Sequence, residues 1–247
     1  SLKEGAIDSS LEAFVNIPIG SNMAARLSAY NVQDGGWIDN QKASFTYQNG
    51  GINYTINNFT DPYDVAENDY NDSTKEGARL RLAGEFDNFD LDISFLTQDS
   101  IVNGSYETDI LNDLQTAEQS RRTNTRFAPE VYKDNFDQMS ISLSGSITDD
   151  IDVVLTSSIF ERDTEYTYDY SSYVEYYSYA AYSYYVCNYY EYYGYYYIDI
   201  NDCRDPRMTY AQSNDIERTA TEIRVSSDND SGFNWVLGAF QETNEKV

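Results

Sequence analysis

The sequence predicts an all-β protein, an antiparallel up-and-down transmembrane β-barrel of which about eight strands are present. Three observations predict it. Apolar and polar residues alternate with a period of two, short turns alternate with long connections, and one face of each expected strand carries almost no charge. The strands are expected to be about 9–12 residues long. Residues 1–247 are expected to form a single, partial barrel region.

Four hairpins are expected in chain order, each with a turn rich in Gly, Asn, Asp or Ser. The alternating apolar residues of their strands run over 11–19 and 23–29, 78–86 and 91–95, 139–147 and 151–159, and 221–225 and 233–239. The links between hairpins are long and cover 33–73, 99–134 and 163–216. Short periplasmic turns at one end and long extracellular loops at the other are typical of an outer-membrane barrel. Links of this length would count against a compact soluble domain.

The two faces of the expected strands differ in chemistry. One face carries Leu, Ile, Val, Phe and Trp, which would meet lipid in a membrane barrel. The other face would line a wet lumen and carries Glu12, Arg26, Arg79, Arg81, Asp90, Asp92, Glu222 and Arg224. A soluble antiparallel sandwich shows the same alternation with its apolar side turned inward, and this alternative stays open.

The composition excludes several functions. The chain has 42 acidic and 16 basic residues, a net charge of -26 and no histidine. Its charge repels nucleic-acid phosphates, and catalytic triads or metal sites that need histidine are impossible. The acidic run 61–72 has oxygen ligands suited to calcium but lacks EF-hand spacing, so a solvated loop is favoured. No motif singles out a catalytic pair of carboxylates, and we expect no enzyme activity, no cofactor and no metal.

A tyrosine-rich loop is expected at 163–216, with 17 of the 25 tyrosines lying between Tyr166 and Tyr197. Tyrosine rings stack well on sugars, aromatic ligands or a partner surface. The segment could equally be a low-complexity expansion whose tyrosines lie at the membrane interface. Cys187 and Cys203 are the only cysteines, and in an exported chain we expect them to form a disulfide that closes this loop.

Several short segments follow one another in a characteristic order. Near the end of the chain, Glu222, Arg224 and Val225-Ser226-Ser227 form an E-x-R-[VL]-S-S strand. A short turn follows, and then Trp235, Gly238 and Phe240 form a W-x-x-G-x-F strand. The other segments are Leu11–Gly20, Met23–Asn40 with its Asp34-Gly35-Gly36-Trp37-Ile38-Asp39-Asn40, Asn68–Asp72 and Gly77–Leu82. In their order and spacing these segments resemble the barrel of a TonB-dependent outer-membrane receptor.

The resemblance implies a bacterial outer-membrane protein that takes up a scarce ligand such as a ferric siderophore or an oligosaccharide. Such receptors have barrels of about 22 strands closed by an N-terminal plug. Their implied partners are outer-membrane lipid and lipopolysaccharide, the TonB complex acting through the plug, and a small-molecule or oligosaccharide ligand. Because about eight strands are expected and no plug, we interpret the chain as an internal fragment of a receptor.

Two alternatives remain. One is a small, complete eight-stranded outer-membrane barrel that acts as an adhesin or structural protein. The other is a soluble β-sandwich that binds carbohydrate through the tyrosine-rich loop.

Ligand contacts are expected from the long loops, chosen for their side-chain chemistry. The arginines could instead pair with neighbouring acids, and that interpretation is favoured for them. The candidate ligand-binding residues are Trp37, Tyr63, Tyr70, Arg121, Arg122, Arg126, Tyr184, Tyr185, Tyr189 and Tyr190.

Overall fold

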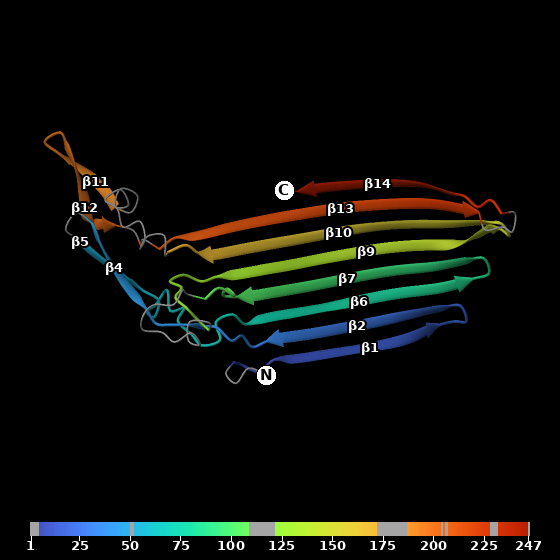
Figure 1. Ribbon diagram of the computed structural model, residues 1–247, viewed down its shortest axis with the longest axis horizontal. Coiled ribbons are helices and arrows are strands. Elements are labelled where there is room, and N and C mark those ends of the chain that lie inside the picture. Colours follow the sequence, from blue (N-terminus) through green and yellow to red (C-terminus); the bar gives the residue numbers. More distant parts are fainter. Residues whose placement is uncertain are drawn as a thin grey trace.

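A computed structural model describes residues 5–49, 52–108, 122–171, 187–203, 205, 207–227 and 232–246. These residues form an all-β structure around one eight-stranded antiparallel sheet (Figure 1). In the described ranges, no helix is long and apolar enough to cross a membrane.

The strands of the sheet follow chain order, with smaller strand pairs inserted in the links. The main sheet consists of β1 (Ser9–Ile19), β2 (Met23–Asp34), β6 (Ser73–Phe86), β7 (Phe89–Asn103), β9 (Val131–Thr148), β10 (Ile151–Asp169), β13 (Thr209–Ser227) and β14 (Val236–Lys246). The inserted pairs are β3 (Asp39–Asn40) with β8 (Thr123–Asn124), β4 (Ser44–Asn49) with β5 (Ile52–Asn57), and β11 (Cys187–Tyr192) with β12 (Tyr195–Cys203).

The two ends of the sheet differ, as the sequence predicts. Tight turns join β1 to β2, β6 to β7 and β9 to β10 at one end of the strands, here called the turn end (Figure 1). The long links and their inserted strand pairs lie at the opposite end of the strands, here called the loop end. The fourth connection is longer than predicted, because β14 begins at Val236 rather than at Phe233. Every neighbouring pair in the main sheet is antiparallel, which confirms the predicted up-and-down order.

The prediction of 9–12-residue strands is wrong for the middle of the sheet. Strands β10 and β13 each have 19 residues, and β9 has 18. Hydrophobic alternation ends before these strands do, because the apolar face of the sheet becomes polar near the loop end, as at Lys133, Asn135 and Asp163. There, cross-strand polar contacts continue the pairing: Arg162 contacts both carboxylate oxygens of Asp134 at 2.7 Å.

One face of the main sheet is apolar across all eight strands, and we call it the apolar face. In a single row of register partners it carries Ile19, Met23, Gly84, Leu91, Leu143, Leu155, Ile223 and Ala239. Large side chains on this face are exposed: Leu11 is 72% accessible, Met139 52% and Ile141 42%. Within the described residues, none of its Leu, Ile, Val, Phe or Met side chains is buried.

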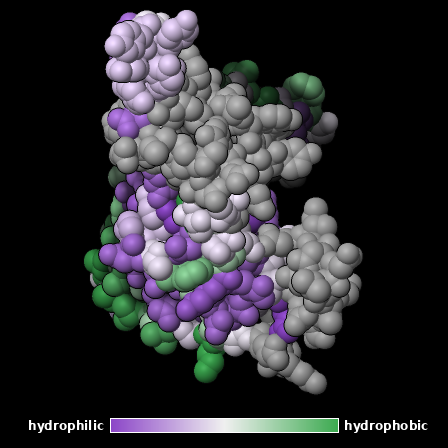
Figure 2. All heavy atoms as spheres, turned by 90° about the vertical axis from the view of Figure 1, so that its left-hand side faces the viewer, coloured by the Kyte–Doolittle hydropathy of each residue, from purple (hydrophilic) through white to green (hydrophobic). Residues whose placement is uncertain are grey.

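The buried apolar residues lie at the loop end instead of on the sheet. They are Ile38, Ile56, Tyr70, Phe127 and Ala128, and all of them belong to the links or to the inserted strands. Figure 2 looks onto the loop end, where hydrophilic side chains cover the middle of the described surface and hydrophobic ones follow its outer margin. The described part of the chain therefore has its core in the loop layer.

Glycine has a packing role on the polar face of the sheet. Tyr30, Gly77 and Gln98 are register partners on β2, β6 and β7. The Tyr30 ring passes over Gly77, and its hydroxyl donates to Oε1 of Gln98 at 2.6 Å. A Cβ at position 77 would lie 2.6 Å from the Tyr30 hydroxyl and 2.7 Å from the Thr97 carbonyl oxygen. Only glycine leaves room for this contact across three strands.

We predict that Gly77→Val lowers the free energy of unfolding by about 1–3 kcal/mol, because the added side chain overpacks the Tyr30 contact. Denaturant titration of the folded protein in detergent would measure the loss. In a Tyr30→Ala background the cost of Gly77→Val should be smaller, since the displaced ring is gone. Additive costs of the two substitutions would contradict this account.

Candidate functional site

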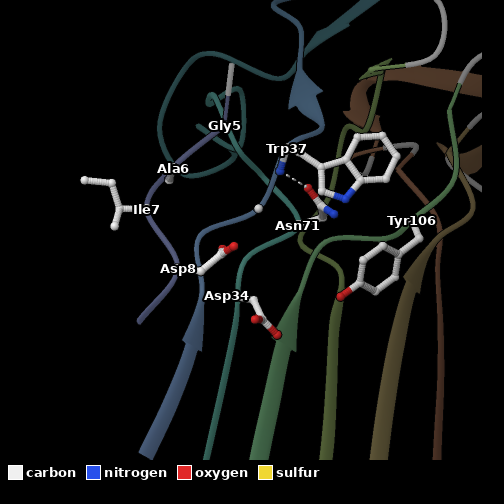
Figure 3. Close-up of a pocket in the computed structure, with 9 residues that line it drawn as sticks. Gly5, Ala6, Ile7, Asp8, Asp34, Trp37, Asn71 and Tyr106 are labelled. Carbon is white, nitrogen blue, oxygen red and sulfur yellow. Dashed lines mark hydrogen bonds between the residues drawn. The ribbon is translucent and has the colours of Figure 1, made fainter. Parts of the chain in front are cut away.

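Two cavities at the loop end share Trp37, and together we call them the Trp37 site. The larger cavity has a volume of about 490 Å³. Its lining residues come from the segment before β1, the end of β2 and the links after β2 and β7 (Figure 3). The smaller has a volume of about 400 Å³. It shares Gly5 and Trp37 with the larger cavity and adds Asp69 and Arg122.

Asn71 fixes the backbone that carries Trp37. Its Oδ1 accepts hydrogen bonds from the backbone N–H groups of Trp37 at 2.8 Å and Ile38 at 2.7 Å. The N–H of Tyr70 donates to the Ile38 carbonyl at 2.6 Å. Asn71 is only 1% exposed, so these bonds are shielded from competing water. The segments 34–40 and 68–72, which both carry the family resemblance, are thereby held against each other.

Gly36 makes this close approach possible. Its φ of 76° lies in the left-handed region, which side chains disfavour. A Cβ at this position would also lie 2.4 Å from the carbonyl oxygen of Asp69. The glycine before Trp37 is therefore required by both backbone conformation and space.

Two further asparagines connect the links beneath the site. Asn40 Oδ1 accepts from the Arg126 N–H at 2.8 Å, and its Nδ2 donates to the Val65 carbonyl at 2.7 Å. Asn58 Nδ2 donates to the carbonyls of Gln41 at 2.7 Å and Arg126 at 2.9 Å. Both asparagines are buried. They replace the regular backbone pairing that irregular links lack.

A buried ion pair lies next to these asparagines. Arg126 Nε is 3.2 Å from the carboxylate of Glu130, and Arg126 Nη2 is 3.1 Å from Glu107 Oε2. Burial raises the pKa of the Glu130 carboxyl, and the charge of Arg126 opposes that shift. Burial also raises the pKa of Tyr70, whose hydroxyl accepts from the Glu130 N–H at 3.1 Å. These contacts join the links after β7 and β8 within the loop layer, while burial makes ionisation of Glu130 costly.

The structure separates the predicted ligand residues into different environments. Trp37 and Arg122 both line the smaller cavity of the Trp37 site. Tyr70 is 4% exposed and Arg126 9%, so both side chains pack inside the loop layer, and a ligand role for them stays a prediction. Tyr63 lies under the guanidinium of Arg207, whose Cζ is 4.0 Å from the ring centre.

The tyrosine-rich segment contributes one described hairpin, β11–β12. Tyr190 is exposed there and stacks on Tyr197 with ring centres 5.7 Å apart. Tyr189 belongs to β11, but its side chain lies outside the described residues, as do Arg121, Tyr184 and Tyr185 entirely. The strand register places Cys187 opposite Cys203. Their side chains also lie outside the described residues, so the disulfide stays a prediction.

Sequence reasoning did not single out four residues that line the larger cavity: Asp8, Asp34, Asn71 and Tyr106. Asp34 and Asn71 belong to two of the segments that carry the family resemblance, and that resemblance was the only signal that the sequence offered for them. Asp8 and Tyr106 have no distinguishing pattern around them. Asp8 reaches the site because β1 pairs with β2, and Tyr106 reaches it from the link after β7.

The chemistry of the Trp37 site is that of binding. It combines aromatic rings, carboxylates and a buried amide in one cavity, which suits recognition of a small polar ligand. Across the described ranges, no group of three or more Asp, Glu, Cys or His side chains is arranged to hold a metal ion.

Comparisons with protein-family models, with curated proteins and with solved structures found no match for this chain.

We predict that the contribution of Glu130 to stability falls as pH rises. A carboxyl whose pKa is raised by folding stabilises the folded state fully below its unfolded pKa, near 4.3, and loses that contribution as pH rises through the folded value. Unfolding free energies of the wild type and Glu130→Gln, measured from about pH 4 upward, should show a wild-type advantage that shrinks with pH. An advantage that stays constant or grows would contradict the prediction.

Proposed function

We propose that this chain forms part of the wall of a bacterial outer-membrane transport barrel, a TonB-dependent receptor that binds its ligand at the loop end. The observation that carries the proposal is the shape of the exposed apolar band on the sheet. From β1 to β9 its position shifts along the register, in the way that tilted strands crossing a flat hydrocarbon layer require.

The band has the same length on distant strands but a shifted position. On β1 it extends from Leu11 to Ile19, and on β9 from Met139 to Ile147, which is nine residues in each case. Nine residues cover about 27 Å along a strand, close to the roughly 25 Å apolar band of outer-membrane barrels once tilt is included.

The strand register gives the size of the shift in band position between β1 and β9. The centre of the band is Val15 on β1 and Leu143 on β9, but the register partner of Val15 on β9 is Met139, four residues away from Leu143. Four residues over the four steps from β1 to β9 is one residue per strand. With strands about 4.8 Å apart and a rise of about 3.4 Å per residue, this slope equals a tilt of about 35°. Barrel strands tilt by about 35–45°.

The end of the band toward the loops is marked by acids. Leu11 on β1 has only polar or acidic register partners on the following strands of the sheet. They are Asn31, Glu76, Asp99, Asn135, Asp163 and Asp215. Charged side chains are costly in hydrocarbon but stable in the headgroup layer and beyond, so these partners fit positions outside the hydrocarbon on the loop side.

The edges of the sheet favour a larger barrel over a closed eight-stranded one. Among the described residues, β1 pairs only with β2 and β14 only with β13. Lipid does not tolerate unpaired backbone groups, so both edges would need further strands of the same wall. A complete eight-stranded barrel would instead need β1 to pair with β14.

The loop end supplies the second part of the proposal. Its links pack around their own buried core and hold the Trp37 site at one end of the sheet. A site at the mouth of a barrel lies where an arriving ligand would be met. This position supports uptake over a purely structural role.

An adjacent pair of substitutions tests the membrane wall. We expect Leu143→Arg, at the centre of the band, to lower the free energy of unfolding in lipid vesicles by about 2–4 kcal/mol, because it places a charge in hydrocarbon. The matched control Ser142→Arg lies on the polar face and should cost less than about 1 kcal/mol. The wild type should fold only with lipid or detergent present. Folding in water without either would favour the soluble sandwich and contradict the proposal.

Uptake is tested separately in the source cells. Mass spectrometry of a defined growth medium should reveal a solute that cells with the protein remove and cells without it leave behind. Since TonB-dependent import is energised from the inner membrane, a protonophore should abolish the removal. Identical media from the two strains, or removal that survives the protonophore, would argue against the receptor and for an adhesin or structural barrel.

A further inference from the structure

We infer that the larger cavity of the Trp37 site binds a small organic cation whose neighbouring oxygen accepts a hydrogen bond. The inference rests on the proposed function for its biological purpose, since the cation would be the imported ligand or a group of it. The binding itself depends only on residues of the cavity, so it can be tested independently of lipid exposure.

Aromatic rings and carboxylates both line this cavity. In the view of Figure 3, the rings of Trp37 and Tyr106 lie on one side and the carboxylates of Asp8 and Asp34 on the other. Tyr106 is 58% exposed and therefore available to a ligand. An ammonium group over an aromatic face is attracted by the ring quadrupole, and a nearby carboxylate adds direct charge attraction.

The two carboxylates keep acceptor capacity for a ligand. Asp8 Oδ1 accepts from the Gly35 N–H at 3.0 Å, and Asp34 Oδ2 accepts from the Ser73 hydroxyl at 3.1 Å. For the second oxygen of each carboxylate, the described contacts include no hydrogen bond. Their positions are therefore fixed by the loop while one oxygen of each remains available.

Among the described residues that line the cavity, no basic side chain compensates these charges. Its described lining residues include two aspartates and neither lysine nor arginine. The chain as a whole carries a net charge of -26, which raises the local concentration of cations around it. A cationic ligand would relieve the repulsion between the two carboxylates, whereas a neutral sugar would leave it unchanged.

Asn71 adds a directed donor. The Oδ1 of Asn71 accepts hydrogen bonds from the backbone N–H groups of Trp37 and Ile38, which fixes the orientation of the amide, so its Nδ2 points away from them. That Nδ2 is buried and has no hydrogen-bond partner, although Asn71 lines the cavity. An unsatisfied buried donor is costly, and an oxygen of the ligand would satisfy it. A ligand with both a cationic group and an oxygen acceptor thus fits all five side chains, Trp37, Tyr106, Asp8, Asp34 and Asn71.

Choline is a suitable probe because it carries a quaternary ammonium and a hydroxyl. Its neutral isostere 3,3-dimethyl-1-butanol has the same shape without the charge. We expect calorimetric titration of the purified protein in detergent to show choline binding at least about tenfold tighter than the isostere. Equal affinities, or no binding of either, would overturn the inference. Binding of a neutral disaccharide without choline would assign the cavity to sugars and overturn it as well.

Conservative variants show whether choline affinity comes from the cavity carboxylates or from the net negative charge of the whole protein. Asp8→Asn and Asp34→Asn keep the acceptors used by Gly35 and Ser73, and each should weaken choline binding by about tenfold. The control Asp90→Asn removes the same charge at the turn end and should change affinity less than about twofold. If all three variants weakened choline binding equally, net charge alone would explain the attraction, and the inference of a cavity site would be wrong. Loss of choline binding in a protein that still shows the Leu143→Arg penalty would refute only this inference.

Discussion

The rest of the structure depends on one constraint, an eight-stranded sheet with a continuous apolar face that no described part of the chain covers. A sheet of this kind is stable in water only when a second layer packs on that face. The buried apolar side chains of the described residues lie at the loop end and cannot serve as that layer. The proposal of a membrane wall follows, because hydrocarbon then takes the place of the missing layer.

The same constraint explains why the sheet and the links satisfy their backbone hydrogen bonds in different ways. The sheet satisfies its own backbone groups through antiparallel pairing, and in the proposed membrane wall its side chains would meet lipid on one face and water on the other. The links have no such pairing. They are held instead by buried asparagines such as Asn40, Asn58 and Asn71, whose amides bridge backbone groups of distant segments. This hydrogen-bonded loop layer holds the Trp37 site at the end of a sheet whose described residues form no apolar core.

The period-two pattern was sufficient to predict all eight strands of the sheet, their order and the placement of the links. It failed at the loop ends of β9, β10 and β13, because pairing there continues through polar contacts such as Arg162 with Asp134 after the hydrophobic alternation has stopped. The site was predicted only in part. Trp37 was identified from its side-chain chemistry, whereas the buried bridging role of Asn71 depends on contacts between segments 33 residues apart, which no local pattern reports.

The measurement that tests the central claim most directly is a map of lipid contact over the sheet. An apolar photoactivatable label dissolved in the native membrane, followed by mass spectrometry, would locate the residues that touch hydrocarbon. The account predicts labelling of the apolar face alone, in a band that moves by one residue per strand from Leu11–Ile19 on β1 to Met139–Ile147 on β9. Labelling of both faces alike, or of neither, would contradict it.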